Sequence, residues 1–325
     1  MNLNFKENNK LKKLETQFYK LYYKNKHPSW MFIGAYGIGK TYQAIKISKF
    51  LLNGSSELYP DDKYISNNPN FFHVKRLNET KSGIITKKQI DEVVIKTKLK
   101  SSNSLNIIII NKLDYVSRDT MNSILKVIEE PPEGWLFIFI VDNYSKIQKT
   151  ISSRCQKLFF PKLVYSEFLT ILEKKNNLEL SKDEIIKLSL ISNNSPGLAI
   201  NMYNLSLINT YNDFLKSFEN KVLINNFLKN FLDKFEKNSD LCWVFNVYCQ
   251  RLFYLVLLEI IEISSNKDVF LENEKNIINA LSIKYKTDTI FILEDNLKII
   301  LFRIETLNSN PFLELKNFMY MFHRG

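Results

Sequence analysis

The sequence predicts an α/β fold in which helices flank a parallel sheet, followed by helical domains that continue to the C-terminal end. Short apolar runs typical of buried strands alternate with amphipathic helical segments up to about residue 160. A phosphate-binding motif at residues 34–41 lies between such a strand and such a helix. After Pro161 the strand pattern ends while helical periodicity continues.

The N-terminal part is predicted to alternate between helices and strands. Residues 5–26 carry apolar side chains at helical spacing, and the run at 107–110 (IIII) is typical of a strand buried on both faces. Ser117 is placed to cap a helix at 118–129, which ends before Pro131 and Pro132. The other predicted segments are helices at 42–52 and 86–99, strands at 30–33, 71–75 and 135–141, a last strand after Cys155, and a turn-rich loop at 53–70.

The C-terminal part is predicted to be helical throughout. Three short helical segments form a small domain, and the chain reads as helical from about residue 212 to the end. These helices are expected at 166–175, 182–192 and 196–204. The predicted domains are 1–160 for nucleotide binding, 161–208 for the small helical domain and 209–325 for a helical oligomerisation domain.

The composition indicates a soluble globular chain, with 45% hydrophobic and 24% charged residues among 325. Three cysteines without a CxxC pair, and an N-terminus without an apolar leader core, predict a protein of the reducing cytoplasm. The stretch at 241–263 is long and apolar enough to cross a bilayer. Its Arg251 would cost about 2.5–3.5 kcal/mol there, so a buried helix and no membrane partner are predicted.

The positive charge is concentrated in the N-terminal half. Residues 1–160 hold 26 Lys and Arg against 14 Asp and Glu, whereas the remainder holds 19 against 20. This basic half suits phosphate-rich partners such as nucleotides or DNA. Most of the basic residues are lysines, which equally fits AT-rich codon usage, so charge alone leaves DNA contact open.

The motif GAYGIGKT matches the phosphate-binding pattern G-x-x-x-x-G-K-[ST] in full. Gly34, Gly37 and Gly39 allow backbone N–H groups to turn toward a phosphate. Lys40 supplies positive charge and the Thr41 hydroxyl a ligand for Mg²⁺. The motif predicts binding of ATP or ADP with Mg²⁺. A loop that no longer binds nucleotide tightly remains open.

The acid needed for hydrolysis is missing from its expected place. In phosphoryl-transfer sites an aspartate at the end of the next buried strand holds the metal shell, and a glutamate often orients the attacking water. Here the strand at 107–110 is followed by Asn111 and Lys112, and the next acid, Asp114, comes too late to substitute simply. The chain is therefore predicted to hydrolyse ATP poorly or not at all.

The segment Ser152-Ser153-Arg154-Cys155 precedes the last predicted strand. An arginine held beside small residues can serve as a finger that neutralises charge on a transferring phosphate. From spacing alone, a surface salt-bridge arginine is the alternative.

These pieces resemble the clamp-loader branch of the AAA+ ATPases, and within it the delta-prime type of bacterial DNA polymerase III subunit. The resemblance extends over residues 27–205. It is carried by the phosphate loop, by Asn122 with ILKVIEEPP (124–132), by SSRC (152–155) and by NNSPGLA (193–199).

The resemblance implies an AAA+ domain with a small helical lid and a helical collar. It implies a hetero-pentameric ring with motor subunits and a delta subunit, which loads a sliding clamp onto primed DNA as part of a DNA polymerase complex. Arg154 matches the arginine that such subunits present to the ATP site of a neighbouring motor subunit. The interface it implies contains Ser153, Glu129, Glu130, Pro131 and Pro132.

Several positions depart from the pattern of ATP-hydrolysing relatives. Residues 42–110 contain no cysteine, so the four-cysteine zinc module of many relatives is not expected. The second-sensor segment at 194–199 has no basic residue, and Val141-Asp142 replaces the first-sensor threonine. With Asn111 and Lys112, these losses favour the delta-prime type over the motor type.

Two other functions remain as alternatives. An active motor ATPase of a similar loader would conflict with the missing acid. A small-molecule kinase would need arginines in its lid, and none occurs between residues 156 and 250. His27, His73 and His323 are interpreted as structural, and no metal site is predicted.

Overall fold

A computed structural model of the protein describes residues 9–54, 67–75, 85–99, 104–116, 118–173, 178, 180–235, 238–262, 271 and 274–322. They form two compact units, the first within residues 1–77, 84–176 and 195–197, the second within 177–194 and 198–325. The elements of the first unit are α1 (Asn9–Asn25), β1 (Ser29–Ile33), α2 (Lys40–Asn53), β2 (Phe71–Val74), α4 (Lys87–Leu99), β3 (Asn106–Ile110), η1 (Leu113–Tyr115), α5 (Arg118–Glu129), β4 (Trp135–Val141), η2 (Tyr144–Lys146), α6 (Lys149–Ser153), β5 (Gln156–Phe159) and α7 (Tyr165–Glu173).

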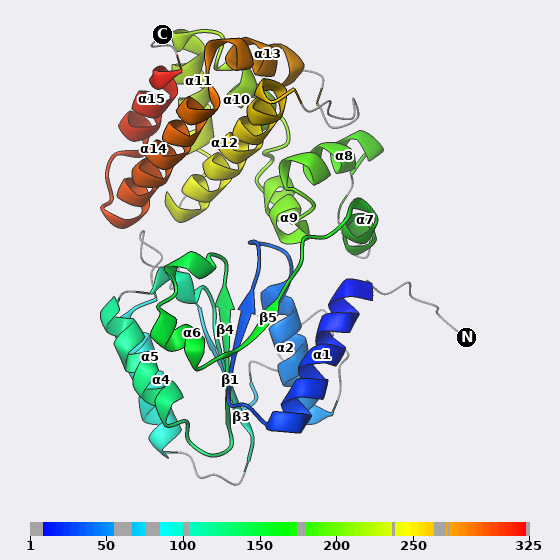
Figure 1. The fold of residues 1–325 in the computed structure, drawn as a ribbon, viewed down its shortest axis with the longest axis vertical. Coiled ribbons are helices and arrows are strands. Elements are labelled where there is room, and N and C mark those ends of the chain that lie inside the picture. The colour runs from blue at the N-terminus through cyan, green and yellow to red at the C-terminus, as the bar shows by residue number, and fades with distance from the viewer. Residues whose placement is uncertain are drawn as a thin grey trace, which may run out of the picture. The chain divides into compact units, whose positions relative to one another are not determined.

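The first unit is built on a parallel sheet of five strands in the order β2-β3-β4-β1-β5 (Figure 1). In this register Ile33, at the end of β1, lies opposite Val141 of β4 and Phe159 of β5. The chain segments that follow β1 and β4 therefore begin side by side at the carboxyl edge of the sheet. This edge is where open α/β sheets place their ligands.

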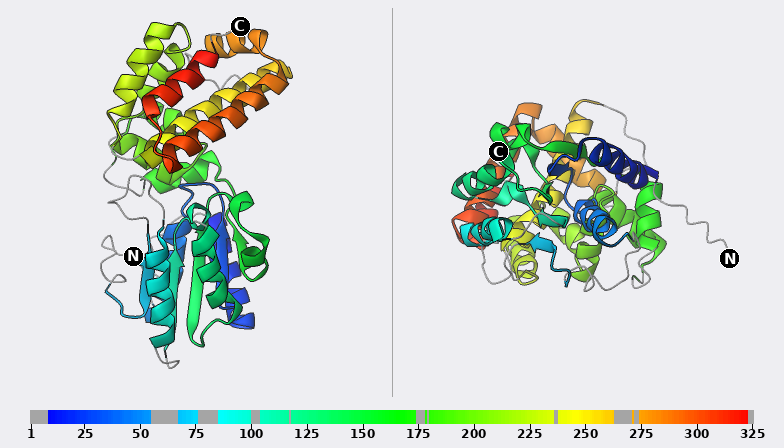
Figure 2. Two further views of the ribbon diagram at one scale, coloured as in Figure 1. Left: turned by 90° about the vertical axis from the view of Figure 1, so that its left-hand side faces the viewer. Right: turned by 90° about the horizontal axis from the view of Figure 1, so that it is seen from below.

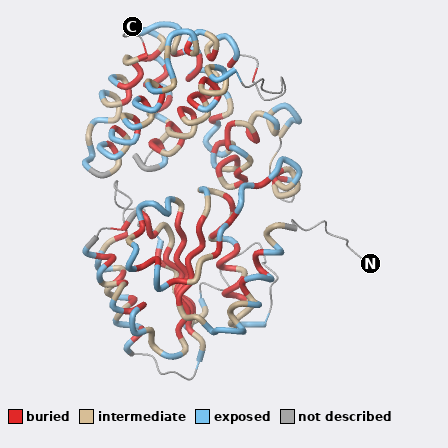
Figure 3. The backbone as a smooth tube through the Cα atoms, in the orientation of Figure 1, coloured by how far each residue is buried: buried red, intermediate tan, exposed pale blue. Residues whose placement is uncertain are grey.

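Both faces of the sheet are buried because helices cover each of them (Figures 1 and 3). Successive side chains of a strand point to opposite faces. Ile108 and Ile110 of β3 pack with α4 and α5, while Ile107 and Ile109 pack with α1 and α2. This two-sided burial explains why the strands read as continuous apolar runs.

The second unit is helical throughout its described residues. It consists of α8 (Lys182–Ile191), α9 (Pro196–Asn204, whose first residues group with the first unit), α10 (Thr210–Lys216), α11 (Lys221–Leu232), α12 (Asn238–Ile260), α13 (Glu274–Lys284), α14 (Thr287–Thr306) and α15 (Pro311–Met321). The long helices α12 and α14 run beside each other (Figure 2). Helix α12 is the one candidate for a membrane span among the described residues, by length and composition only. More than half of its apolar window, within Asp240–Ile260, is buried inside the protein.

A buried polar cluster ties the second unit together. The Arg251 guanidinium donates to both carboxylate oxygens of Glu274, at 2.5 and 2.8 Å, and to the Leu190 carbonyl oxygen at 3.0 Å. Glu274 also accepts from the Tyr211 hydroxyl at 2.7 Å and from the Leu271 backbone N–H at 2.7 Å. Helices α8, α10, α12 and α13 thus share one set of hydrogen bonds.

The parallel α/β sheet and the helical remainder predicted from the sequence are confirmed. Helix α5, strand β4 and helix α9 have the predicted bounds, whereas the short α6 was not predicted. The cap assigned to Ser117, the middle of the predicted loop at 53–70, and His323 lie outside the described residues. The boundaries at residues 160 and 208 stay predictions.

Candidate functional site

The phosphate loop connects the end of β1 to the start of α2 at Lys40. Gly37 and Gly39 have φ angles of 75° and 102°, a region that side chains with a Cβ rarely adopt. These two glycines are therefore required by the backbone itself. The loop ends at a helix N-terminus, where free N–H groups and the helix dipole favour an anion.

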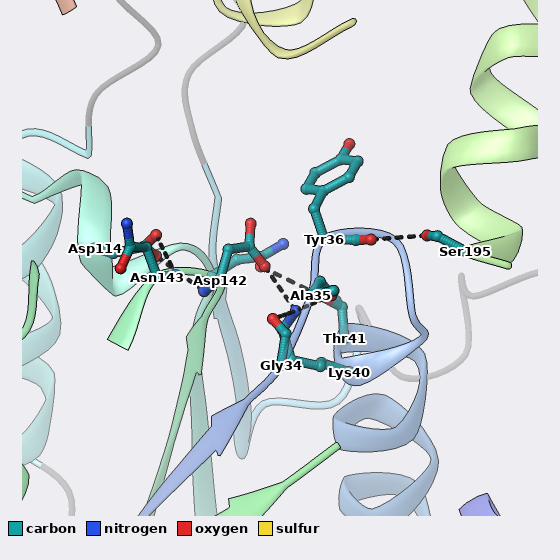
Figure 4. Close-up of polar contacts among 10 residues, drawn as sticks. Gly34, Ala35, Tyr36, Lys40, Thr41, Asp114, Asp142, Asn143 and Ser195 are labelled. Atoms are coloured by element: carbon teal, nitrogen blue, oxygen red, sulfur yellow. Dashed lines mark hydrogen bonds and ion pairs between the residues drawn. The ribbon is translucent and has the colours of Figure 1, made fainter. Parts of the chain in front are cut away.

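The segment at residues 195–197 also contacts the phosphate loop through hydrogen bonds. The Ser195 hydroxyl donates to the Tyr36 carbonyl oxygen at 2.7 Å (Figure 4). The Gly197 N–H donates to the Gly37 carbonyl oxygen at 2.8 Å. A Cβ on Gly197 would lie 2.8 Å from that oxygen, so only glycine fits. In the sequence, residues 193–199 contributed to the family resemblance and lacked the basic residue of a second sensor, but this support of the loop was not predicted.

Lys40 is held by three acceptors. Its Nζ lies 2.7 Å from the carbonyl oxygens of Gly34 and Ala35 and 2.7 Å from Oδ1 of Asp142 (Figure 4). The lysine side chain is 3% exposed. Asp142 can reach it because the register aligns the ends of β1 and β4.

Asp114 fixes the segment that carries Asp142. Its two carboxylate oxygens accept the backbone N–H groups of Asp142 at 3.3 Å and Asn143 at 3.0 Å. Burial, and then the nearby charge of Asp142, raise the pKa of the Asp114 carboxyl above its usual value, although these hydrogen bonds oppose the shift. Asp114 therefore acts as a buried acceptor that positions the backbone after β4. No pattern in the sequence predicted this role.

The position of the expected acid is occupied by groups unsuited to hydrolysis. Asn111, at the end of β3, accepts a hydrogen bond from the Thr41 hydroxyl at 3.2 Å through its side-chain oxygen. Lys112 adopts φ 59°, and its Nζ lies 4.4 Å from the centroid of the Tyr36 ring, within cation–π range. Neither side chain can accept a proton from water at neutral pH.

The loop meets only part of what a nucleotide and its metal need. The backbone of the loop fits a phosphate group, but its lysine is already paired, and Asn111 and Lys112 rather than an acid directly follow β3. Within the described part of the chain, no group of three or more His, Cys, Asp or Glu residues is arranged to hold a metal ion. The site therefore fits phosphate recognition better than metal-assisted hydrolysis.

Arg154 follows the short helix α6 and precedes β5. Its guanidinium donates to the Thr150 carbonyl oxygen at 2.9 Å and pairs with Oε1 of Glu129 at 3.0 Å. The side chains of Arg154 and Glu129 are 40% and 46% exposed. Its neighbour Cys155 is buried, and burial raises the pKa of that thiol to about 12, so it packs as a small apolar residue.

Arg154 lies at the opposite edge of the sheet from the loop of its own chain. The first residue of β5, Gln156, is opposite Trp30, whereas the loop begins after Ile33, opposite Phe159. Three residues of strand span about 10 Å. The guanidinium instead contacts Glu129, the last residue of α5, and the Thr150 carbonyl oxygen.

The other predicted interface residues gather near this arginine. Ser153 is exposed, and Glu130, Pro131 and Pro132 are exposed or half-buried just after α5. The structure thus brings together Arg154, Ser153 and the end of α5 at one edge of the sheet. It brings Lys40, Thr41 and Asn111 together at the other.

The fold and the loop define an AAA+ protein, with an α/β domain and a helical C-terminal domain. A family model described as DNA polymerase III, delta subunit, matches residues 7–164. The chain belongs to the clamp-loader family of DNA polymerase III subunits.

Individual relatives carry the same family names. Subunit gamma of DNA polymerase III from Buchnera aphidicola subsp. Baizongia pistaciae is 28% identical over 258 residues, 73% of this chain and 68% of that protein. Subunit delta' from Buchnera aphidicola subsp. Schizaphis graminum is 30% identical over 142 residues, 43% of this chain and 42% of that protein. Subunit gamma/tau from Mycoplasma genitalium is 34% identical over 90 residues, which is 27% of this chain and only 15% of that protein.

Among solved structures, a DNA polymerase III gamma subunit-related protein from Thermotoga maritima is similar to this chain. The alignment covers 97% of this chain and 99% of the Thermotoga chain. The two chains are 14% identical, with a TM-score of 0.42.

Proposed function

We propose that this chain is a delta-prime-type subunit of a bacterial clamp loader, which completes the ATP site of a neighbouring motor subunit with Arg154. The observation that carries the proposal is the position of that arginine. It is half-exposed, anchored by Thr150 and Glu129, and separated from its own phosphate loop by the length of β5. A guanidinium so placed is accessible to a second chain.

The loss of hydrolytic groups supports the same proposal. Asn111 and Lys112 stand where a metal-binding acid and a base are needed, and Lys40 is already paired with Asp142. A subunit that no longer hydrolyses ATP can still accelerate hydrolysis in a neighbour. Such an arginine finger contributes about 10³–10⁵ in rate at the site it completes.

The partners follow from this role. The chain would act in the cytoplasm within a hetero-pentameric ring of motor subunits and a delta subunit, with the sliding clamp and primed DNA as the ligands of the assembly. ATP or ADP with Mg²⁺ would bind weakly or serve only a structural purpose in this chain, and no zinc would be needed.

An ATP-hydrolysing motor subunit is the second candidate. Its support is the intact phosphate-binding motif, together with an alignment to a subunit gamma that covers more of the chain than the alignment to a subunit delta'. The purified chain distinguishes the two roles. Motor-like ATP turnover by this chain alone, with Mg²⁺ and free of contaminants, would establish the second candidate.

The decisive experiment is reconstitution with the motor subunits of the same loader. We expect clamp- and DNA-stimulated ATPase to require this chain, and Arg154→Ala to reduce turnover about 10³-fold at the one site that it completes. Because other sites in the ring keep their own fingers, single-turnover kinetics is the appropriate measurement. An unchanged fast phase would reject the finger role.

Two variants make this experiment specific. Arg154→Lys keeps the charge but loses the planar fork, so it should recover only part of the rate. Arg303→Ala removes another exposed arginine, which lies 3.8 Å from Glu314, and should leave the rate unchanged. Co-purification with the motor subunits shows whether each variant still assembles.

A further inference from the structure

Lys40 of the phosphate loop has an acceptor for each of its side-chain N–H donors, and one of these acceptors is Asp142. An ammonium group has three N–H donors. Nζ of Lys40 has three acceptors at 2.7 Å, namely Oδ1 of Asp142 and the carbonyl oxygens of Gly34 and Ala35. No donor remains for a nucleotide phosphate unless one of these contacts breaks.

The carboxylate of Asp142 is held in this place by the fold. Asp142 directly follows β4, a buried central strand next to β1, and the register sets the ends of the two strands opposite each other. Its backbone N–H and that of Asn143 donate to the buried Asp114. The negative charge therefore sits on a fixed segment of backbone.

We propose that Asp142 is an internal anion that takes the place of a phosphate on Lys40 and thereby sets a low affinity of this chain for nucleoside diphosphates and triphosphates. A phosphate that enters the loop must displace the carboxylate from Lys40 and then remain close to it as a like charge. The glycine-rich backbone can still accommodate a phosphate, but the Asp142 carboxylate occupies Lys40 and opposes phosphate binding. This inference concerns the chain's own loop and holds whether or not Arg154 serves a neighbour.

The proposal predicts that removing the charge of Asp142 increases the affinity of the chain for ADP and ATP. The full chain is titrated with ADP and with ATP by calorimetry, once with Mg²⁺ and once with EDTA. Asp142→Asn, which keeps the shape of the side chain, should bind ADP at least about tenfold more tightly than the wild type in both conditions. Asp142→Glu keeps the charge and should bind as weakly as the wild type.

Two further variants identify the cause of any gain. Adding Lys40→Ala to Asp142→Asn should abolish the gain, because the freed lysine is the group that receives the phosphate. Asp240→Asn, an exposed acid on α12, is the matched control and should bind as the wild type does.

Other outcomes overturn the proposal. Equal or weaker binding of ADP by Asp142→Asn in EDTA would show that the carboxylate does not compete with phosphate for Lys40. Loss of binding by this variant only with Mg²⁺ would make Asp142 a metal ligand instead. A gain that survives Lys40→Ala also overturns it. Should Asp142→Asn fail to fold, Asp142→Thr is the replacement, and submicromolar binding of ADP to the wild type would refute the proposal without any variant.

Discussion

Two arginine–glutamate pairs in this chain have the same chemistry and opposite surroundings. Arg251 and Glu274 form a bidentate ion pair, and their side chains are 9% and 0% exposed. Arg154 and Glu129 form a single contact between side chains that are 40% and 46% exposed. The first pair joins helices within the second unit, and the second lies at an edge of the sheet in the first unit.

The difference shows how burial separates a structural charge from one available to a partner. Removing one member of a buried pair leaves an uncompensated charge in a medium of low polarity, so the pair cannot exchange partners. An exposed pair contributes little to stability because water replaces each partner readily. Arg154 can therefore leave Glu129 for a phosphate at small cost, whereas Arg251 is committed to the fold.

The largest effect on stability is expected from the buried pair. Glu274→Ala leaves Arg251 without its charge partner and also removes the acceptor of Tyr211 and of the Leu271 N–H. We expect the free energy of unfolding to fall by about 3–5 kcal/mol. Urea unfolding of the full chain measures this change.

The matched control for that experiment is Glu314→Ala. Glu314 faces Arg303 at 3.8 Å in a partly exposed pair, so its loss should cost less than about 1 kcal/mol. Equal losses from the two substitutions would show that burial does not distinguish the pairs.

A half-buried ionisable group, His73, extends the comparison. His73 lies on β2, and its Nε2 has no hydrogen-bond partner in the described part of the chain. Burial, with a smaller effect of Lys75, lowers its pKa to about 4. His73 therefore binds a proton near pH 6.5 in the unfolded chain, but only near pH 4 in the folded chain.

The sign of the pH dependence follows from this shift. As pH falls from about 6.5 to 4, the unfolded state gains the proton first, so His73 lowers the free energy of unfolding. A shift of that size corresponds to at most about 3 kcal/mol. Unfolding curves at pH 7 and pH 4 should show His73→Phe losing less stability than the wild type by about that amount. Parallel losses would indicate that His73 is protonated in the folded protein.

Much of the fold was predictable because its signals are local. Helix α5 has an apolar face and a proline pair at its end, and the continuous apolar run of β4 matches a strand covered on both faces. Gly37 and Gly39 of the phosphate loop were predictable for the same reason, since a backbone with positive φ requires them. Helix α6 was missed because five residues are too few to show a helical period.

The contacts that define the candidate site could not be derived from the sequence. Lys40 meets Asp142, and Tyr36 accepts from Ser195, only because the sheet register and the chain path bring distant segments together. The sequence predicted that Asp142 replaces a sensor residue, but not that its carboxylate would bind the lysine of the loop. Asp114 was set aside as a catalytic acid, and its hydrogen bonds to the backbone after β4 were not foreseen.

The smallest effect is expected from the exposed pair. Glu129→Ala should change the free energy of unfolding by less than about 1 kcal/mol, because both side chains are already hydrated and Thr150 still holds the guanidinium. A double-mutant cycle with Arg154→Ala, followed by urea unfolding, isolates the pair from other effects of each substitution.

A coupling energy of about 0–1 kcal/mol in that cycle means that Glu129 gives up the arginine easily, as a finger for another chain requires. A coupling near that of a buried pair, about 3 kcal/mol or more, would mean that Arg154 is fixed within its own fold. The distinction between a committed and an available arginine would then fail. The reason for expecting Arg154 to act on the nucleotide of a neighbouring subunit would then fail as well.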